Sequence, residues 1–260
     1  MKLKSATPAV VLAAALALAG CSAPAPEPTP TETAAADTLS GTITVFAAAS
    51  LTDSFQEIAD AFNEEHPDVT VTFNFGGSSG LATQIVEAAP ADVFAAASPA
   101  TMKTVTDAAL TDGEPADFAT NVLEIAVAKG NPGGITGLED FANPDKTIAL
   151  CAVEVPCGAA AAKLFDAAGI VPSVDTYEQD VKAVLTKVEL GEVDAGVVYV
   201  TDVLDAGDAI EGIEVDSAPV AYPIATLSAS TNPEAAQAFV DFVLSAKGQQ
   251  ILKKAGFGAP

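Results

Sequence analysis

The sequence predicts an α/β protein with two lobes around a cleft, and three of its features lead to this prediction. First, strand and helix patterns alternate along residues 42–109, as is typical of parallel strands joined by right-handed helical crossovers. Second, another series of this kind follows within residues 122–200. Third, small and hydroxyl residues follow several strands where helices begin. Ligands of open α/β sheets bind at such junctions.

The first α/β unit alternates strands with helices whose apolar residues recur at spacings of three and four. Its expected strands are residues 42–46, 69–75 and 92–95, and its expected helices are residues 51–65, 81–87 and 99–109. The glycine- and serine-rich loop 76–80 leads into the second of these helices.

The second unit repeats this alternation and is followed by two helices at the end of the chain. Its expected strands are residues 122–128, 147–150 and 195–200, and its expected helices are residues 159–168 and 180–190. Residues 218–224 are expected to be extended, and the final helices are expected over residues 233–244 and 246–254.

The first twenty residues predict an export signal that is removed before a lipid-modified cysteine. Lys2 and Lys4 precede an apolar stretch too short to span a bilayer, and Leu-Ala-Gly leads to Cys21. We therefore expect residues 1–20 to be a lipoprotein signal peptide. Residues 21–39 then form the lipidated cysteine and a flexible, proline- and threonine-rich tether. An extracytoplasmic protein anchored to the cell membrane is the expected result.

The charge balance limits the classes of partner. The chain has 35 acidic and 11 basic residues, for a net charge of -24. This charge disfavours nucleic acids and anionic membrane surfaces as partners. An anionic ligand would have to be held by local dipoles, although solubility alone also explains such a charge. His66 is the only histidine, which argues against most histidine-based catalysis and transition-metal sites.

Five residues at strand and helix junctions are candidates for an anion site. Helix N-termini expose unpaired N–H groups at the positive end of the helix dipole. Hydroxyl groups add further neutral donors, and together they suit a small dianion. Taken singly, each serine could be a helix cap and the tyrosine could be a core residue. The candidates are Ser50, Ser78, Cys157, Val181 and Tyr199.

No cation is expected in this site, and no carboxylate can be placed in it from the sequence. No arginine lies near the junctions, and the nearest cations are Lys163 and Lys182, both expected to point away. Size and donor count would then determine selectivity. The carboxylates of Asp53, Asp180 and Asp202 lie close enough in the sequence to require exclusion.

Several motifs in this order resemble the molybdate-binding proteins of bacterial molybdate ABC transporters. They are TVFAAASLT at residues 44–52, FGGSSGLATQI at 75–85, ADVFAAAS at 91–98, VPCG at 155–158, GVVYVTD at 196–202 and AGFG at 255–258. The sequence departs from that family's pattern at Gly80, commonly threonine, and in the residues just before Val155.

The resemblance implies a type II periplasmic-binding-protein fold with two lobes and a two-segment hinge. Residues 40–121 and 224–260 would form lobe 1, and residues 122–223 would form lobe 2. It also implies that the hydroxyls of Ser50, Ser78 and Tyr199 and the backbone N–H groups of Cys157 and Val181 hold an oxyanion. Molybdenum would be bound only within the oxyanion, without direct protein ligands.

Cys151 and Cys157 remain once Cys21 is lipidated, and an oxidising compartment favours a disulfide between them. Two reduced, buried thiols are one alternative. A reactive thiol at Cys157 is another, because a helix N-terminus lowers the pKa of a cysteine.

We therefore expect a monomeric binding protein, not an enzyme, that takes up molybdate or tungstate without a cofactor and delivers it to an ABC permease. Sulfate or phosphate as the ligand is an alternative. An envelope thiol enzyme that uses Cys157 is a remote one, because no serine-hydrolase motif accompanies it.

Overall fold

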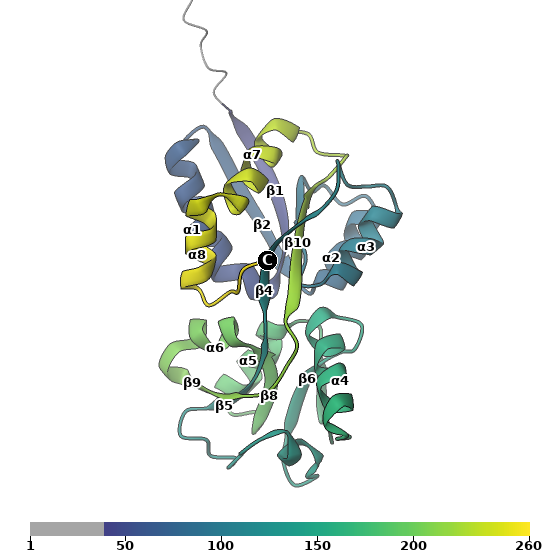
Figure 1. Ribbon diagram of the computed structural model, residues 1–260, viewed down its shortest axis with the longest axis vertical. Coiled ribbons are helices and arrows are strands. Elements are labelled where there is room, and N and C mark those ends of the chain that lie inside the picture. The colour runs from purple at the N-terminus through teal and green to yellow at the C-terminus, as the bar shows by residue number, and fades with distance from the viewer. Residues whose placement is uncertain (1–38) are drawn as a thin grey trace, which may run out of the picture. The chain divides into compact units, whose positions relative to one another are not determined.

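The computed structural model describes residues 39–260, in which two five-stranded sheets form the centres of two lobes (Figure 1). The predicted signal peptide, Cys21 and nearly all of the predicted tether lie outside the described residues. Within residues 39–260, no helix is long and apolar enough to cross a membrane.

The first sheet has the strand order β2-β1-β3-β10-β4. Strands β1, β2 and β3 are parallel, as predicted, whereas β10 runs antiparallel to both of its neighbours. This direction follows from the path of the chain. Strand β10 enters from the second lobe and therefore runs away from the edge where β1 and β3 end. The strands are β1 (Gly41–Ala48), β2 (Val69–Gly76), β3 (Val93–Ala95), β4 (Ala116–Asn121) and β10 (Val220–Thr226).

The second sheet has the strand order β7-β6-β8-β5-β9. Its strand directions also follow from the path of the chain between the lobes. Strand β5 arrives from the first lobe and runs antiparallel to β8 and β9, whereas β6 is parallel to β7 and β8. The carboxyl ends of β6 and β8 therefore face the first lobe. The strands are β5 (Leu123–Ala128), β6 (Ile148–Cys151), β7 (Thr176–Glu178), β8 (Ala195–Tyr199) and β9 (Ile210–Glu214).

Helices cover both faces of the first sheet. One face packs against α1 (Thr52–Glu65), α7 (Pro233–Leu244) and α8 (Ala246–Lys254), with Phe55, Phe62 and Phe239 at the centre of the core. The other face packs against α2 (Ser78–Val86) and α3 (Pro99–Asp107) in a separate apolar cluster. The chain therefore returns to lobe 1 for its last two helices (Figure 1).

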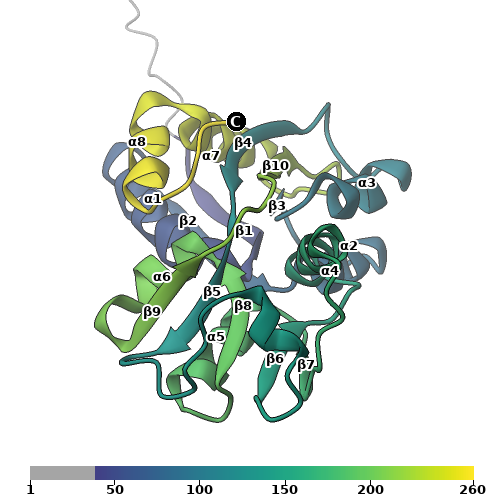
Figure 2. The same cartoon turned by 60° about the horizontal axis from the view of Figure 1, so that its bottom comes forward.

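Helices also surround the second sheet (Figure 2). They are α4 (Pro156–Ala168), α5 (Val181–Glu189) and α6 (Val200–Ala206). The core of this lobe contains Ile125, Val184, Val197 and Phe165, all buried. The short helical turns η1 (Ala49–Leu51), η2 (Leu138–Ala142) and η3 (Gly207–Ala209) complete the described elements.

Some elements differ from the sequence prediction. Strands β4, β7 and β9 and helix α6 were not predicted, because short or mixed patterns carry little periodicity. Helix α2 begins at Ser78, three residues before its predicted start at Leu81. Strand β10 begins at Val220, and Val220 pairs with Asn121 in the first sheet. The second crossing between the sheets therefore lies within residues 215–219, a few residues before the predicted lobe boundary at 223/224.

Candidate anion-binding site

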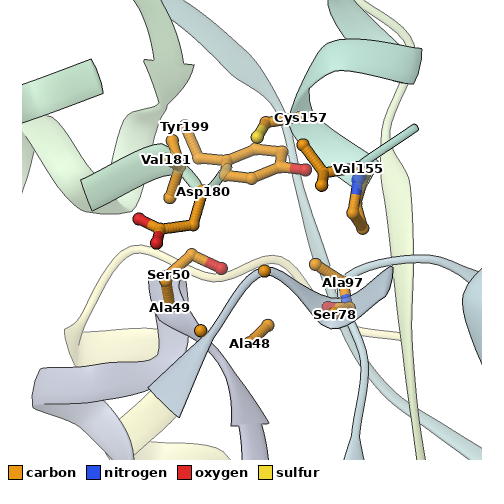
Figure 3. A pocket seen from close by; sticks show the side chains of 13 residues that line it. Ala48, Ala49, Ser50, Ser78, Ala97, Val155, Cys157, Asp180, Val181 and Tyr199 are labelled. Atoms are coloured by element: carbon orange, nitrogen blue, oxygen red, sulfur yellow. The ribbon is translucent and has the colours of Figure 1, made fainter. Parts of the chain in front are cut away.

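The structure places all five predicted site residues around one small cavity between the lobes (Figure 3). Ser50 and Ser78 come from elements of the first lobe, and Cys157, Val181 and Tyr199 from the second. The cavity contains about 220 Å³ of space, part of it open to solvent. The enclosed part is smaller still, so the cavity has room only for a small ligand.

The two serine hydroxyls are buried and each contacts another protein group. The backbone N–H of Ala97 donates to Ser78 Oγ at 3.0 Å. This contact uses a lone pair of the oxygen and leaves the hydroxyl proton of Ser78 available. Ser50 Oγ lies 2.9 Å from the hydroxyl oxygen of Tyr222, and either atom can donate. If Tyr222 donates, Ser50 also keeps its proton for a ligand.

Two helices begin at the cavity without a capping side chain. Ser78 is the first residue of α2, and Cys157 follows Pro156, the first residue of α4. The residues that precede these helices, Gly77 and Val155, form no side-chain cap. The first N–H groups of both helices therefore have no partner within the helix and lie at the positive end of its dipole.

A third helix begins at Val181, and here Asp180 acts as the cap. An oxygen of the Asp180 carboxylate accepts the N–H of Ala183 at 2.9 Å. The Val181 N–H precedes the capped position and stays available at the cavity wall. Asp180, whose place relative to the site the sequence could not predict, therefore lines the cavity and accepts a hydrogen bond from the first turn of α5.

Among the hydroxyl groups in this wall, that of Tyr199 is buried without a protein partner. Tyr199 is 1 % exposed, and its hydroxyl has no hydrogen-bond partner within residues 39–260. Figure 3 shows the phenol extending across the cavity between Cys157 and Val155. Burial raises the pKa of Tyr199 well above its usual value, and the neighbouring Tyr222 and Asp202 raise it further. The phenol therefore stays protonated and can donate a hydrogen bond.

Sequence reasoning missed Tyr222, which lies 172 residues from Ser50. This residue is fully buried on β10, and its ring packs edge-on against that of Tyr199 with centroids 5.9 Å apart. Tyr222 thus links a serine of lobe 1 to the tyrosine of lobe 2. A tyrosine within an apolar extended segment was the only signal for it.

The expectation that Lys182 points to solvent is wrong. Its ammonium group lies 3.0 Å from Asp53 on α1, 3.3 Å from Asp205 and 3.7 Å from Asp202, both on α6. The sequence could not show that three carboxylates from two other helices converge there. Burial alone would lower the pKa of Lys182, but these carboxylates raise it above its usual value. Lys163, as expected, does not line the cavity.

Asp202 is the most deeply buried member of this cluster. Its side chain is inaccessible to solvent, and one carboxylate oxygen accepts the backbone N–H of Tyr199 at 3.0 Å. Burial raises the pKa of Asp202 to about 7, although Lys182 opposes this effect. The contact with the backbone fixes the start of α6 and with it the position of Tyr199.

A disulfide joins Cys151, at the end of β6, to Cys157 at the start of α4. The chain folds back so tightly here that a Cβ atom at Gly158 would lie 1.9 Å from the carbonyl oxygen of Ala152. The bond holds the first turn of α4 against the sheet. It also occupies the sulfur that a thiol enzyme based on Cys157 would need.

Asp180 supplies a carboxylate to the cavity wall, and the positive partial charge of the wall comes from dipoles alone. No lysine lines it, and the sequence contains no arginine. Within residues 39–260, no group of three or more His, Cys, Asp or Glu side chains is placed to hold a metal ion. The wall therefore offers hydroxyl and N–H donors from both lobes to a ligand between them.

Comparisons with known proteins identify relatives of this chain. Residues 43–258 match the family model of the bacterial extracellular solute-binding proteins. The molybdate-binding protein ModA of Mycobacterium tuberculosis is 41% identical over 222 residues, which cover 84% of this chain and 85% of that protein.

Solved structures show the same fold at low sequence identity. The periplasmic molybdate-binding protein of Azotobacter vinelandii has a TM-score of 0.76 and 19% identity, covering 84% of this chain and 99% of its own. The sulfate-binding protein SubI of M. tuberculosis has a TM-score of 0.75 and 19% identity, covering 83% of this chain and 86% of its own. The fold is therefore the two-lobe type II periplasmic-binding-protein fold, and this chain belongs to the family of bacterial extracellular solute-binding proteins.

Proposed function

We propose that this protein binds either molybdate or tungstate between its two lobes and delivers the bound ion to an ABC permease. The observation that carries the proposal is the set of neutral donors from both lobes around one small cavity: Ser50, Ser78, Cys157, Val181 and Tyr199. A dianion without a proton needs only donors, and this wall supplies hydroxyl and N–H groups. The similarity to the mycobacterial molybdate-binding protein supports the choice of ion.

The same wall disfavours hydrogen phosphate at neutral pH. A protonated oxyanion needs an acceptor for its own proton, and a buried donor without an acceptor is unfavourable by about 1–3 kcal/mol. Asp180 is the carboxylate in the cavity wall, and one of its two oxygens already accepts the N–H of Ala183 at the start of α5. Only its other oxygen could serve a protonated oxyanion. Sulfate has no such proton and is the stronger competitor, because a sulfate-binding protein shares this fold.

Isothermal titration of the mature protein with molybdate, tungstate, sulfate and phosphate tests the proposal. We expect molybdate and tungstate to bind at least 100-fold more tightly than sulfate, equivalent to about 2.8 kcal/mol. Sulfate binding as tight as molybdate binding would refute the molybdate assignment and leave a general oxyanion carrier.

We also propose that Cys21 carries the lipid that keeps the protein at the cell membrane, close to the permease. The short apolar stretch before Leu-Ala-Gly-Cys supports this proposal. Mass spectrometry of the membrane fraction should find acyl chains on Cys21. Replacement of Cys21 by serine should release the protein from that fraction.

A further inference from the structure

At one edge of the anion cavity the two lobes approach so closely that a glycine of the cavity wall, Gly77, has no room for a side chain. Gly77 precedes α2 in lobe 1. A Cβ atom at this position would lie 2.1 Å from the backbone carbonyl oxygen of Gln179, in lobe 2. Side chains could move out of such a clash, but this oxygen belongs to the backbone. An alanine at position 77 therefore requires the backbones of Gly77 and Gln179, which belong to different lobes, to move apart.

The backbone of Gly77 does not itself require glycine. Its φ of -62° and ψ of 123° are ordinary extended values that any residue can adopt. The structural reason for glycine is therefore space between the lobes. The three atoms nearest to a Cβ atom at Gly77 all belong to lobe 2: the carbonyl oxygen and carbon of Gln179, and Val155 Cγ1 at 3.5 Å. Lobe 1 should therefore fold unchanged with alanine.

Other interlobe contacts lie at both ends of the cavity. On the Gly77 side, the Ser79 hydroxyl donates to the carbonyl oxygen of Glu154 at 2.5 Å. On the far side, Lys182 of lobe 2 donates to Asp53 of lobe 1 at 3.0 Å. Together with the Gly77 contact, these two hydrogen bonds fix the distance between the donors of lobe 1 and the donors of lobe 2.

We propose that Gly77 and the Asp53–Lys182 pair are positioning residues that fix the closed arrangement of the lobes and so set the affinity for the oxyanion. The reason is geometric. Gln179 lies two residues before Val181, so a lobe displaced at Gln179 carries the Val181 N–H away from an ion held by Ser78. For its affinity readout, this inference rests on the proposed function.

Gly77→Ala is the first test, and Gly80→Ala is its matched control on α2. A Cβ atom at Gly80 would meet nothing within 4 Å, so the control should bind molybdate as the unchanged protein does. We expect Gly77→Ala to bind molybdate at least tenfold more weakly, because loss of one hydrogen bond to a charged group has an effect of this size. Its unfolding temperature should match that of the unchanged protein, whereas that of Gly80→Ala should be higher, because alanine stabilises a helix interior relative to glycine.

Small-angle X-ray scattering separates closure from direct effects on the ion. Gly77→Ala should give a larger radius of gyration than Gly80→Ala, with or without molybdate. Weaker binding with an unchanged scattering curve would overturn the inference, and so would binding within twofold of the control. If the unchanged protein bound no oxyanion, the proposed function would fail, while the scattering of ligand-free protein would still decide the role of Gly77.

Asp53→Asn tests the opposite end of the cavity and leaves Lys182 with Asp202 and Asp205. Its control is Asp60→Asn, on the same helix, because Asp60 is exposed and forms no ion pair within residues 39–260. An ion pair as exposed as this one contributes up to about 1 kcal/mol, so we expect molybdate affinity about two- to fivefold below that of the control. Equal affinities of the two variants would remove the ion pair from the proposal.

Discussion

Replacing Tyr199 by phenylalanine removes one buried hydroxyl from the cavity wall and leaves the packed ring in place. That hydroxyl has no hydrogen-bond partner within the described residues, so the folded protein gains nothing from it there. If the hydroxyl serves an anion, its loss should weaken binding without weakening the fold. If it serves the core, the reverse should hold.

The structure sets the size of both effects. A hydrogen bond to a charged ligand contributes about 1.5–3 kcal/mol, so Tyr199→Phe should lower molybdate affinity about 10- to 150-fold. A buried hydroxyl without a partner destabilises a fold by about 1–3 kcal/mol. The free energy of unfolding of the ligand-free variant should therefore stay the same or rise by up to that amount.

The chain has three tyrosines, and the other two provide controls. Tyr177 is 60% exposed, and Tyr177→Phe should change neither quantity. Tyr222→Phe removes the partner of Ser50 and should lower the free energy of unfolding by about 0.5–1.5 kcal/mol.

Calorimetric titration with molybdate measures the affinity of each variant, and unfolding in urea without ligand measures its free energy of unfolding. The reasoning fails if Tyr199→Phe keeps its affinity and loses about 1 kcal/mol or more of stability. That result would show that Tyr199 is a core residue, and its buried hydroxyl would no longer count as a donor for a ligand.

Three further predictions concern the groups around the cavity. Ser78→Ala should weaken molybdate binding by about 1.5–3 kcal/mol in calorimetry. It should also lower the free energy of unfolding by about 1–3 kcal/mol, because the Ala97 N–H loses its acceptor. Asp202 has a folded pKa of about 7 against an ordinary value of 3.8, so the folded chain binds this proton more tightly than the unfolded chain. Its contribution to stability should therefore fall by at most about 4 kcal/mol as the pH rises from about 4 to about 8. Asp202→Asn should remove this part of the pH dependence in urea titrations, and equal slopes in both proteins would contradict the assignment. Replacing both Cys151 and Cys157 by serine should lower the free energy of unfolding by about 2 kcal/mol, since the bond closes a loop of six residues. Unchanged molybdate affinity in that variant would show that α4 keeps its first turn in place without the bond.

The positions of the five candidate residues could be predicted because each lies where a strand or loop gives way to a helix. In a sheet with parallel strands, such junctions gather at one edge. The two sheets turn these edges toward each other, so Ser50 and Ser78 oppose Cys157, Val181 and Tyr199 (Figure 3).

What the sequence could not provide is the pairing of groups that lie far apart along the chain. Tyr222 contacts Ser50 across 172 residues, and Lys182 contacts Asp53 across 129 residues. Local periodicity carries no information on such contacts. The same reason hid the antiparallel direction of β10 (Val220–Thr226), which depends on the edge at which the chain re-enters lobe 1.

These long-range contacts also connect the small cavity to residues of both lobes that lie outside it. Ser50 is held by Tyr222 on β10, the strand of lobe 1 that follows the second crossing, and Tyr222 packs against Tyr199 of the second lobe. Tyr199 is held in turn by Asp202, which lies beside Lys182. A ligand that contacts donors from both lobes gains all of them only at one lobe separation, because packed side chains allow discrete arrangements rather than a continuous range. If the protein binds the ion as proposed, its affinity should therefore depend on the separation of the lobes as well as on the donors. The comparison of Gly77→Ala with Gly80→Ala tests this dependence without removing a donor from the cavity wall.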